Sequence, residues 1–142
     1  MSTRRFLLAC AVLVGVALAW NGVVHLVVLR DAEAVVRALY RPDLGDRMWL
    51  SVLAAVATVV VYVAGFVRFV RSSALREAVG YGLFFAAAAG VLVDLNQYVL
   101  LPIPGRLACL WFLAGVIEFT LYGVIARRLI RPAAGTTPKM SW

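Results

Sequence analysis

The chain has 142 residues, of which 64% are hydrophobic and only 15% charged, and its formal net charge is +7. A soluble domain is typically about 45–50% apolar and about 25% charged, and a chain of this size cannot hide so much apolar surface from water. The composition therefore excludes an ordinary soluble domain and indicates a membrane protein. Its basic residues flank apolar runs instead of gathering on one soluble face, so we expect a lipid bilayer and no nucleic acid as partner.

Four apolar segments are long enough to cross a bilayer, which takes about 20 residues of helix. They cover approximately residues 6–29, 48–67, 78–101 and 107–126. Each is expected to be helical, because the backbone in lipid must satisfy its own hydrogen bonds. The sequence thus predicts an all-α, four-helix transmembrane bundle as one domain over residues 1–131. Residues 132–142, rich in proline, glycine and threonine, are predicted to form a disordered cytoplasmic tail.

The first segment has some features of a cleaved signal peptide. Arg4 and Arg5 precede it, and Ala17-Leu18-Ala19 resembles a cleavage site. The apolar run continues past that point to Leu29, however, which favours a retained helix over a cleaved one.

The distribution of charge between the loops predicts the orientation. One side has nine basic residues against the single acid Glu77, and the other has five against four acids. The first side is predicted to be cytoplasmic, because cytoplasmic loops are enriched in lysine and arginine. Both termini fall on that side, and we expect a multi-pass protein of the bacterial inner membrane. The nine are Arg4, Arg5, Arg68, Arg71, Arg76, Arg127, Arg128, Arg131 and Lys139.

The outward loop from Arg30 to Arg47 is the one sizeable loop between the predicted helices. Asp31 is suited to cap a short helix over residues 32–40, which would place Val35, Val36 and Leu39 on one side. We expect that helix to lie at the membrane interface.

Each predicted helix has a stripe of small or polar residues, which is how helices associate in lipid. The stripe of the third helix repeats every four residues and leads from a small-residue ridge to a carboxylate and a phenol. These stripes are expected to face the bundle interior. The four stripes are Asn21 and His25; Ser51, Ala55, Thr58, Tyr62 and Gly65; Gly82, Ala86, Gly90, Asp94 and Tyr98; and Trp111, Gly115, Glu118 and Tyr122.

The polar residues on these stripes form the predicted ligand- or proton-binding site. Ionisable groups inside a span are costly and often functional, and Asp94, His25 and Glu118 fall at compatible depths. The complete predicted set is Asp94, His25, Glu118, Asn21, Tyr98 and Tyr122.

Structural explanations stand beside this functional one. Asp94 is able to bond Asn21 or His25, and Glu118 is able to bond Tyr62 or Thr58 across the bundle. The aromatic residues near the outer boundary, which are Trp20, Trp49, Tyr98 and Trp111, are typical of an interfacial aromatic belt.

No metal site or cofactor is expected. His25 is the single histidine, and the two cysteines have no metal-ligand spacing. The sequence has no phosphate-binding loop, nucleophile elbow or haem attachment motif.

Parts of the chain resemble small four-helix bacterial inner-membrane proteins of uncharacterised function. The similar stretches are Asn21-Gly22-Val23-Val24-His25 through Arg41-Pro42, Gly80-Tyr81-Gly82-Leu83-Phe84-Phe85, and Tyr98 to Pro104. The resemblance implies a stand-alone four-helix domain in the inner membrane, and it implies no activity and no catalytic residues.

Three hypotheses for the function follow. The first is binding or transport of a small ligand, ion or proton through an outward-facing polar site; because four helices enclose little room, a homodimer or a larger membrane complex is left open for it. The second is a non-catalytic accessory subunit of a larger membrane complex. The third is an intramembrane enzyme with Asp94 and Glu118 as acid and base; it ranks last, because nothing identifies a substrate.

Overall fold

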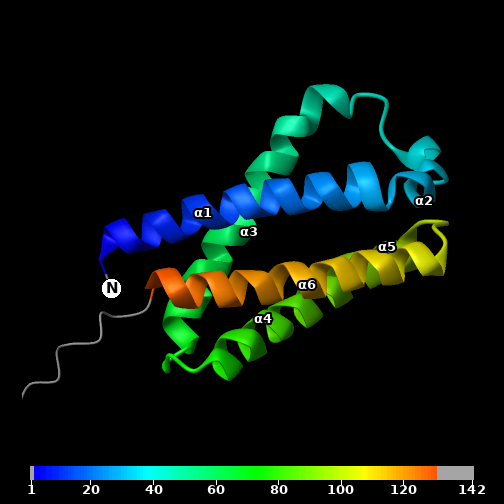
Figure 1. Ribbon diagram of the computed structural model, residues 1–142. Helices are drawn as coiled ribbons and strands as arrows, with labels where there is room; N and C mark the ends of the chain where they lie inside the picture. Colours follow the sequence, from blue (N-terminus) through cyan, green and yellow to red (C-terminus); the bar gives the residue numbers. More distant parts are fainter. Residues whose placement is uncertain (1, 131–142) are drawn as a thin grey trace, which may run out of the picture.

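A computed structural model describes residues 2–130, and every regular element among them is helical (Figure 1). The tail predicted for residues 132–142 lies outside the described residues. In chain order the elements are α1 (Thr3–Val23), the π-helical turn η1 (Val24–Val28), α2 (Arg30–Ala34), the short 3₁₀ turns η2 (Arg37–Leu39) and η3 (Gly45–Arg47), α3 (Met48–Phe69), α4 (Leu75–Gly90), the π-helical turn η4 (Val91–Leu95), α5 (Asn96–Leu100) and α6 (Gly105–Ile130).

These elements join into four continuous helices that are long and apolar enough to cross a membrane, as the sequence predicted. Their bounds are Thr3–Val28, Gly45–Phe69, Leu75–Leu100 and Gly105–Ile130. Most of the helical residues beyond the predicted bounds lie at the arginine-rich ends. The last helix, for example, continues to Ile130, whereas its predicted end was residue 126. Hydropathy detects only the apolar part of a helix, whereas arginine is a good helix former whose long side chain reaches water from a membrane boundary.

Helices α4 and α6 form the closest pair in the bundle, and glycine makes their approach possible. A Cβ atom on Gly82 would overlap the backbone carbonyl of Phe119, and one on Gly123 would overlap that of Ala78. Such close backbone contact between small residues is the usual way that helices pack in lipid. The predicted small-residue ridge of the third helix therefore exists over Gly82, Ala86 and Gly90, which are all buried.

An aromatic cluster fills the half of the bundle nearer the arginine-rich ends. Tyr62 of α3 is fully buried at its centre, with ring centroids 5.0 Å from both Tyr81 and Phe85 and 5.5 Å from Tyr122. The Tyr62 hydroxyl donates a hydrogen bond to the carbonyl of Phe119 at 3.0 Å. These side chains close the bundle on this side.

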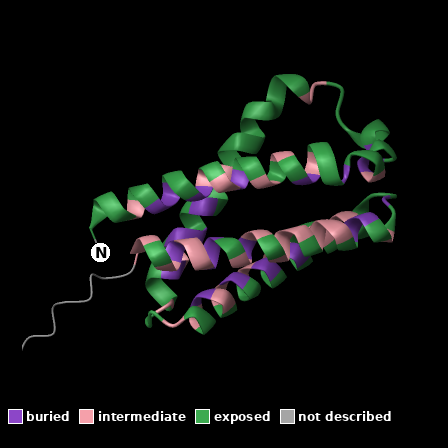
Figure 2. Cartoon of the chain, in the orientation of Figure 1, coloured by how far each residue is buried: buried purple, intermediate pink, exposed green. Residues whose placement is uncertain are grey.

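Helix α3 diverges from the other helices towards its N-terminal end (Figure 1). Every residue from Met48 to Ala54 is exposed, whereas Val59, Tyr62, Val63 and Phe66 further along are buried (Figure 2). The first two turns of α3 are thus largely uncovered by the rest of the described chain and, within a bilayer, would contact lipid.

The loop between α1 and α3 folds over the end of the bundle. Val36 is buried in a second apolar cluster with Leu29, Ile103 and Leu107. The predicted helix over 32–40 is wrong in its extent, because α2 begins at Arg30 without a side-chain cap and ends at Ala34. Of the three residues predicted to share a face, only Val36 is buried, because the helix ends before Leu39 comes into line.

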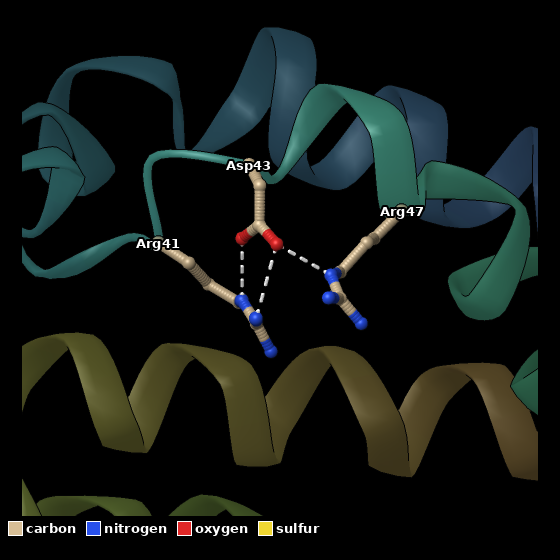
Figure 3. A network of polar contacts seen from close by, with 3 residues as sticks. All are labelled: Arg41, Asp43 and Arg47. Carbon is tan, nitrogen blue, oxygen red and sulfur yellow. Dashed lines mark hydrogen bonds and ion pairs between the residues drawn. The ribbon is translucent and has the colours of Figure 1, made fainter.

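A charged network fixes the last part of this loop before α3. Asp43 accepts hydrogen bonds from Arg41 at 2.7 and 3.1 Å and from Arg47 at 2.6 Å (Figure 3). The two guanidinium groups hold the pKa of Asp43 below its usual value. The carboxylate therefore stays ionised and joins the loop to the start of α3.

Candidate functional site

A polar cavity of about 410 Å³ lies between α1, α4 with η4, and α6, close to the folded-over loop. It collects charged and amide side chains from α1, η1, α2, η4, α5 and α6. We call it the polar cavity. The lining residues with polar or ionisable side chains that matter below are Trp20, Asn21, His25, Glu33, Tyr40, Asp94, Gln97, Trp111 and Glu118.

Glu33 lies at one end of the polar cavity, and the sequence did not predict it as a site residue. Its carboxylate accepts a hydrogen bond from His25 Nδ1 at 2.5 Å and another from Trp111 Nε1 at 2.9 Å. Among residues 2–130 it is the single charged residue that is buried, at 8% exposure. The sequence offered His25 as one of two bonding partners for Asp94, whereas the structure pairs it directly with Glu33.

The sequence offered little to identify Glu33. It lies in a loop with other charges, outside all four apolar segments, where an acid is normally solvated. The one available signal was that Glu33 and Val36 are three residues apart, which is the spacing of one helical face. The packing of α2 over the end of α6 buries both.

Glu118 of α6 forms a second group of polar contacts. Its Oε1 atom accepts hydrogen bonds from Asn21 Nδ2 at 2.9 Å and from the Tyr122 hydroxyl at 2.5 Å. The structure thus brings together three of the predicted site residues. Tyr62 and Thr58, the expected partners of Glu118, form no hydrogen bond with it, because Tyr62 donates to a backbone carbonyl instead.

Asp94 lines the polar cavity together with Asn21, His25 and Glu118. Asn21 instead bonds Glu118 and the carbonyl of Ala17, and His25 bonds Glu33. No side chain among the described residues forms a hydrogen bond with Asp94. Of the three carboxylates in the polar cavity, it is the one left without a donor.

His25 and Asp94 both lie in π-helical turns, η1 and η4. In η1, for example, the N–H of Leu29 donates to the carbonyl of Val24 at 2.7 Å, five residues back. Such turns are rare and occur often at functional sites. Each inserts an additional residue into its helix and so changes the direction of the side chains that follow.

Two predicted site residues, Tyr122 and Tyr98, do not line the polar cavity. Tyr122 contacts it through its hydrogen bond to Glu118, whereas the structure places Tyr98 elsewhere. The four-residue spacing placed it in line with Asp94, but η4 intervenes and rotates the following turn. Tyr98 is exposed, and its ring lies beside Gly105 at the turn into α6. The spacing rule failed because it assumes an uninterrupted α-helix.

Two of the four aromatic residues interpreted as an interfacial belt face inward instead. Trp111 bonds Glu33, and Trp20 lines the polar cavity with a buried Nε1 that has no hydrogen-bond partner among the described residues. Trp49 and Tyr98 are exposed, as a belt requires. The change for Trp20 and Trp111 follows from the loop that covers them.

The polar cavity is acidic although the chain as a whole is basic. Three carboxylates and one imidazole line it, and no lysine or arginine of the described residues does. Tyr40, at the same end, is a neutral hydrogen-bonding group, because partial burial and the nearby Glu33 carboxylate raise its pKa. The arrangement therefore favours a positively charged guest.

Within residues 2–130, no group of three or more histidine, cysteine, aspartate or glutamate side chains is placed to hold a metal ion. Of the three carboxylates that line the polar cavity, Glu33 and Glu118 are held by different donors, and Asp94 has no side-chain donor among the described residues.

No protein-family model matches the chain, and neither the curated proteins nor the solved structures searched contain a match.

Proposed function

We propose that the chain is a multi-pass protein of the bacterial inner membrane that binds a small organic cation in the polar cavity, from the outer side. The observation that carries this proposal is the composition of the lining. Glu33, Asp94 and Glu118 surround a cavity without lysine or arginine, in a chain with a net charge of +7. Carboxylates inside a span, such as Asp94 and Glu118, are costly to retain, so their presence with the buried Glu33 in one cavity supports a functional role.

The size and the aromatic residues of the polar cavity agree with an organic cation. Its volume of about 410 Å³ lies within the range of about 300–1,000 Å³ usual for small-molecule sites. Trp20, Tyr40 and Trp111 line it. Aromatic rings attract cations through their negative faces, and quaternary ammonium ligands are commonly bound this way.

Asp94 is the residue proposed to meet the charge of the guest. Glu33 and Glu118 already accept two hydrogen bonds each. Asp94 has no such donor, so its carboxylate is the least compensated and gains most from an approaching cation.

The aromatic cluster favours binding over conduction. Phe119 lines the polar cavity and also packs against Tyr62 and Phe85, with centroids 5.9 and 4.9 Å away. These rings, together with Tyr122, fill the bundle between the polar cavity and the arginine-rich ends. A guest that enters from the outer side therefore reaches a closed end.

The proposal is tested with tetraethylammonium as the probe, titrated into the purified protein in a neutral maltoside detergent. Trp20 and Trp111 line the polar cavity, so tryptophan fluorescence is the readout. We expect saturable binding that Asp94→Asn weakens about tenfold or more, since one charge pair at this depth corresponds to at least about 1.4 kcal/mol.

The matched control is Asp46→Asn, which removes an equal charge from an exposed loop position away from the polar cavity. Its affinity should equal that of the wild type. Absence of saturable binding, or equal weakening by both substitutions, would contradict the proposal.

The accessory-subunit hypothesis has one observation in its favour, the exposed first turns of α3 from Met48 to Ala54. Recovery of a stoichiometric partner in mild detergent, together with no cation binding, would support it over the proposal above.

A further inference from the structure

A second cavity of about 690 Å³ lies between α1 and the diverging N-terminal half of α3. We call it the lateral cleft. It is continuous with the polar cavity, because the two have common walls. The shared lining residues are Asn21, His25, Glu33, Tyr40, Thr58, Glu118 and Phe119.

Away from these shared residues, the lateral cleft is predominantly apolar. Leu18 and Leu26 line it from the first helix, and Met48, Val52 and Ala55 from α3. Leu26, Met48 and Val52 are all exposed, so no other part of the described chain covers them. A polar compartment rich in carboxylates is thus joined directly to an apolar compartment at membrane depth.

We propose that the ligand is a single-chain cationic amphiphile whose ammonium head occupies the polar cavity and whose hydrocarbon chain occupies the lateral cleft. This inference rests on the proposed function and adds the ligand class to it. The two joined compartments match the two halves of such a molecule, one through charge and the other through apolar surface. The head meets Asp94, and the chain passes Asn21 and Gly22 to lie against α3.

The charges decide against an ordinary phospholipid as the occupant. A phosphate group would approach Glu33 and Glu118, and no lysine or arginine between residues 2 and 130 lines either cavity. Negative charges that lie close together repel strongly in a medium of low dielectric constant. An ammonium head without phosphate is the chemistry that fits both compartments.

Gly22 provides a direct way to fill the lateral cleft. It lines the cleft, and a Cβ atom built there meets nothing within 4 Å. Gly22→Leu therefore places a side chain in the cleft without a clash in the helix itself. Gly15→Leu is the matched control, because Gly15 lies on the same helix, also has nothing within 4 Å, and lines neither cavity.

The experiment measures the affinity of alkyltrimethylammonium ions from ethyl to octyl by tryptophan fluorescence in maltoside micelles. We expect the wild type to bind more tightly as the chain lengthens, by about two- to fourfold per methylene that leaves water. Gly22→Leu should remove most of this gain and retain binding of the ethyl compound. Gly15→Leu should behave as the wild type. Partitioning of the probe into the micelle is the same for all variants, so it cancels when they are compared. Alkyl sulfates of equal length should not bind.

The outcomes separate the two proposals. If the ethyl compound binds through Asp94 but affinity does not rise with chain length, the amphiphile inference is overturned and the cation site stands. If the ethyl compound does not bind, both fail. Ala55→Leu is a second variant, which fills the cleft from α3. The inference is also overturned if affinity still rises with chain length in both Gly22→Leu and Ala55→Leu. If Gly22→Leu does not fold, Ala55→Leu alone decides.

Discussion

Glu33 is the buried acid of the outer loop. Its carboxylate joins three elements, because it lies on α2 and accepts hydrogen bonds from His25 in η1 and Trp111 in α6. A buried carboxylate with two donors is stable, whereas its removal leaves buried donors without partners. Together with the buried Val36, this side chain holds the loop over the polar cavity.

We expect Glu33→Ala to lower the free energy of unfolding by about 2–4 kcal/mol, since two hydrogen bonds to a charged group are lost. The measurement is the midpoint of unfolding as dodecyl sulfate is added to protein in maltoside micelles. Glu33→Gln should recover part of the loss, because the amide oxygen still accepts from Trp111.

Asp31→Ala is the control for Glu33→Ala, as it removes an exposed acid from the same short helix. Its midpoint should stay close to that of the wild type. Equal shifts for the two alanine variants would show that the contacts of Glu33 contribute no stability.

At the scale of elements, the two π-helical turns and the glycine contacts decide which side chains meet. The turns lie beside the polar cavity, at His25 and Asp94. Gly82 and Gly123 lie in the half of the α4–α6 pair nearer the arginine-rich ends, where they let the two backbones touch. Close packing in one part of the pair thus supports an open, polar region in the other.

We expect Gly82→Ala to destabilise the protein by about 1–3 kcal/mol, because the added methyl group overlaps the Phe119 carbonyl and forces the helices apart. The same unfolding assay measures the effect. Gly80→Ala, two residues away on α4 with open space around it, should leave stability unchanged or raise it. Equal stability of the two variants would contradict the close contact between α4 and α6.

At the scale of the whole molecule, the four apolar helices and the charges at their ends imply a defined orientation. The arginine-rich ends, the aromatic cluster and both chain termini are predicted to be on the cytoplasmic side. The polar cavity and the loop with Asp43 would then face outward. Access of a ligand to the polar cavity depends on this orientation.

We expect Asp46→Cys, in a chain whose Cys10 and Cys109 are replaced by alanine, to react with a membrane-impermeant maleimide added to intact spheroplasts. Ser72→Cys, in the loop between α3 and α4, should react only after permeabilisation. Both positions are exposed, so folding does not restrict the reagent. The opposite labelling pattern would invert the orientation and with it the outward access of the site.

The sequence by itself determined the number and approximate extent of the four apolar helices, and the small-residue ridge from Gly82 to Gly90. These features are local, because the length and hydropathy of a segment and the four-residue spacing of a face do not depend on the rest of the chain. The same reasoning identified Asn21, His25, Asp94 and Glu118 as polar groups at compatible depths, and the structure lines one cavity with all four.

The tertiary structure alone decided the burial of Glu33, the position of Tyr98 and the divergence of α3. Glu33 is buried because a loop packs on a helix distant in sequence, which no local pattern encodes. Tyr98 leaves the face of Asp94 because a π-helical turn changes the phase of its helix. Helix α3 separates from α1 towards its N-terminal end, so its buried residues begin only at Val59, and this separation forms the lateral cleft.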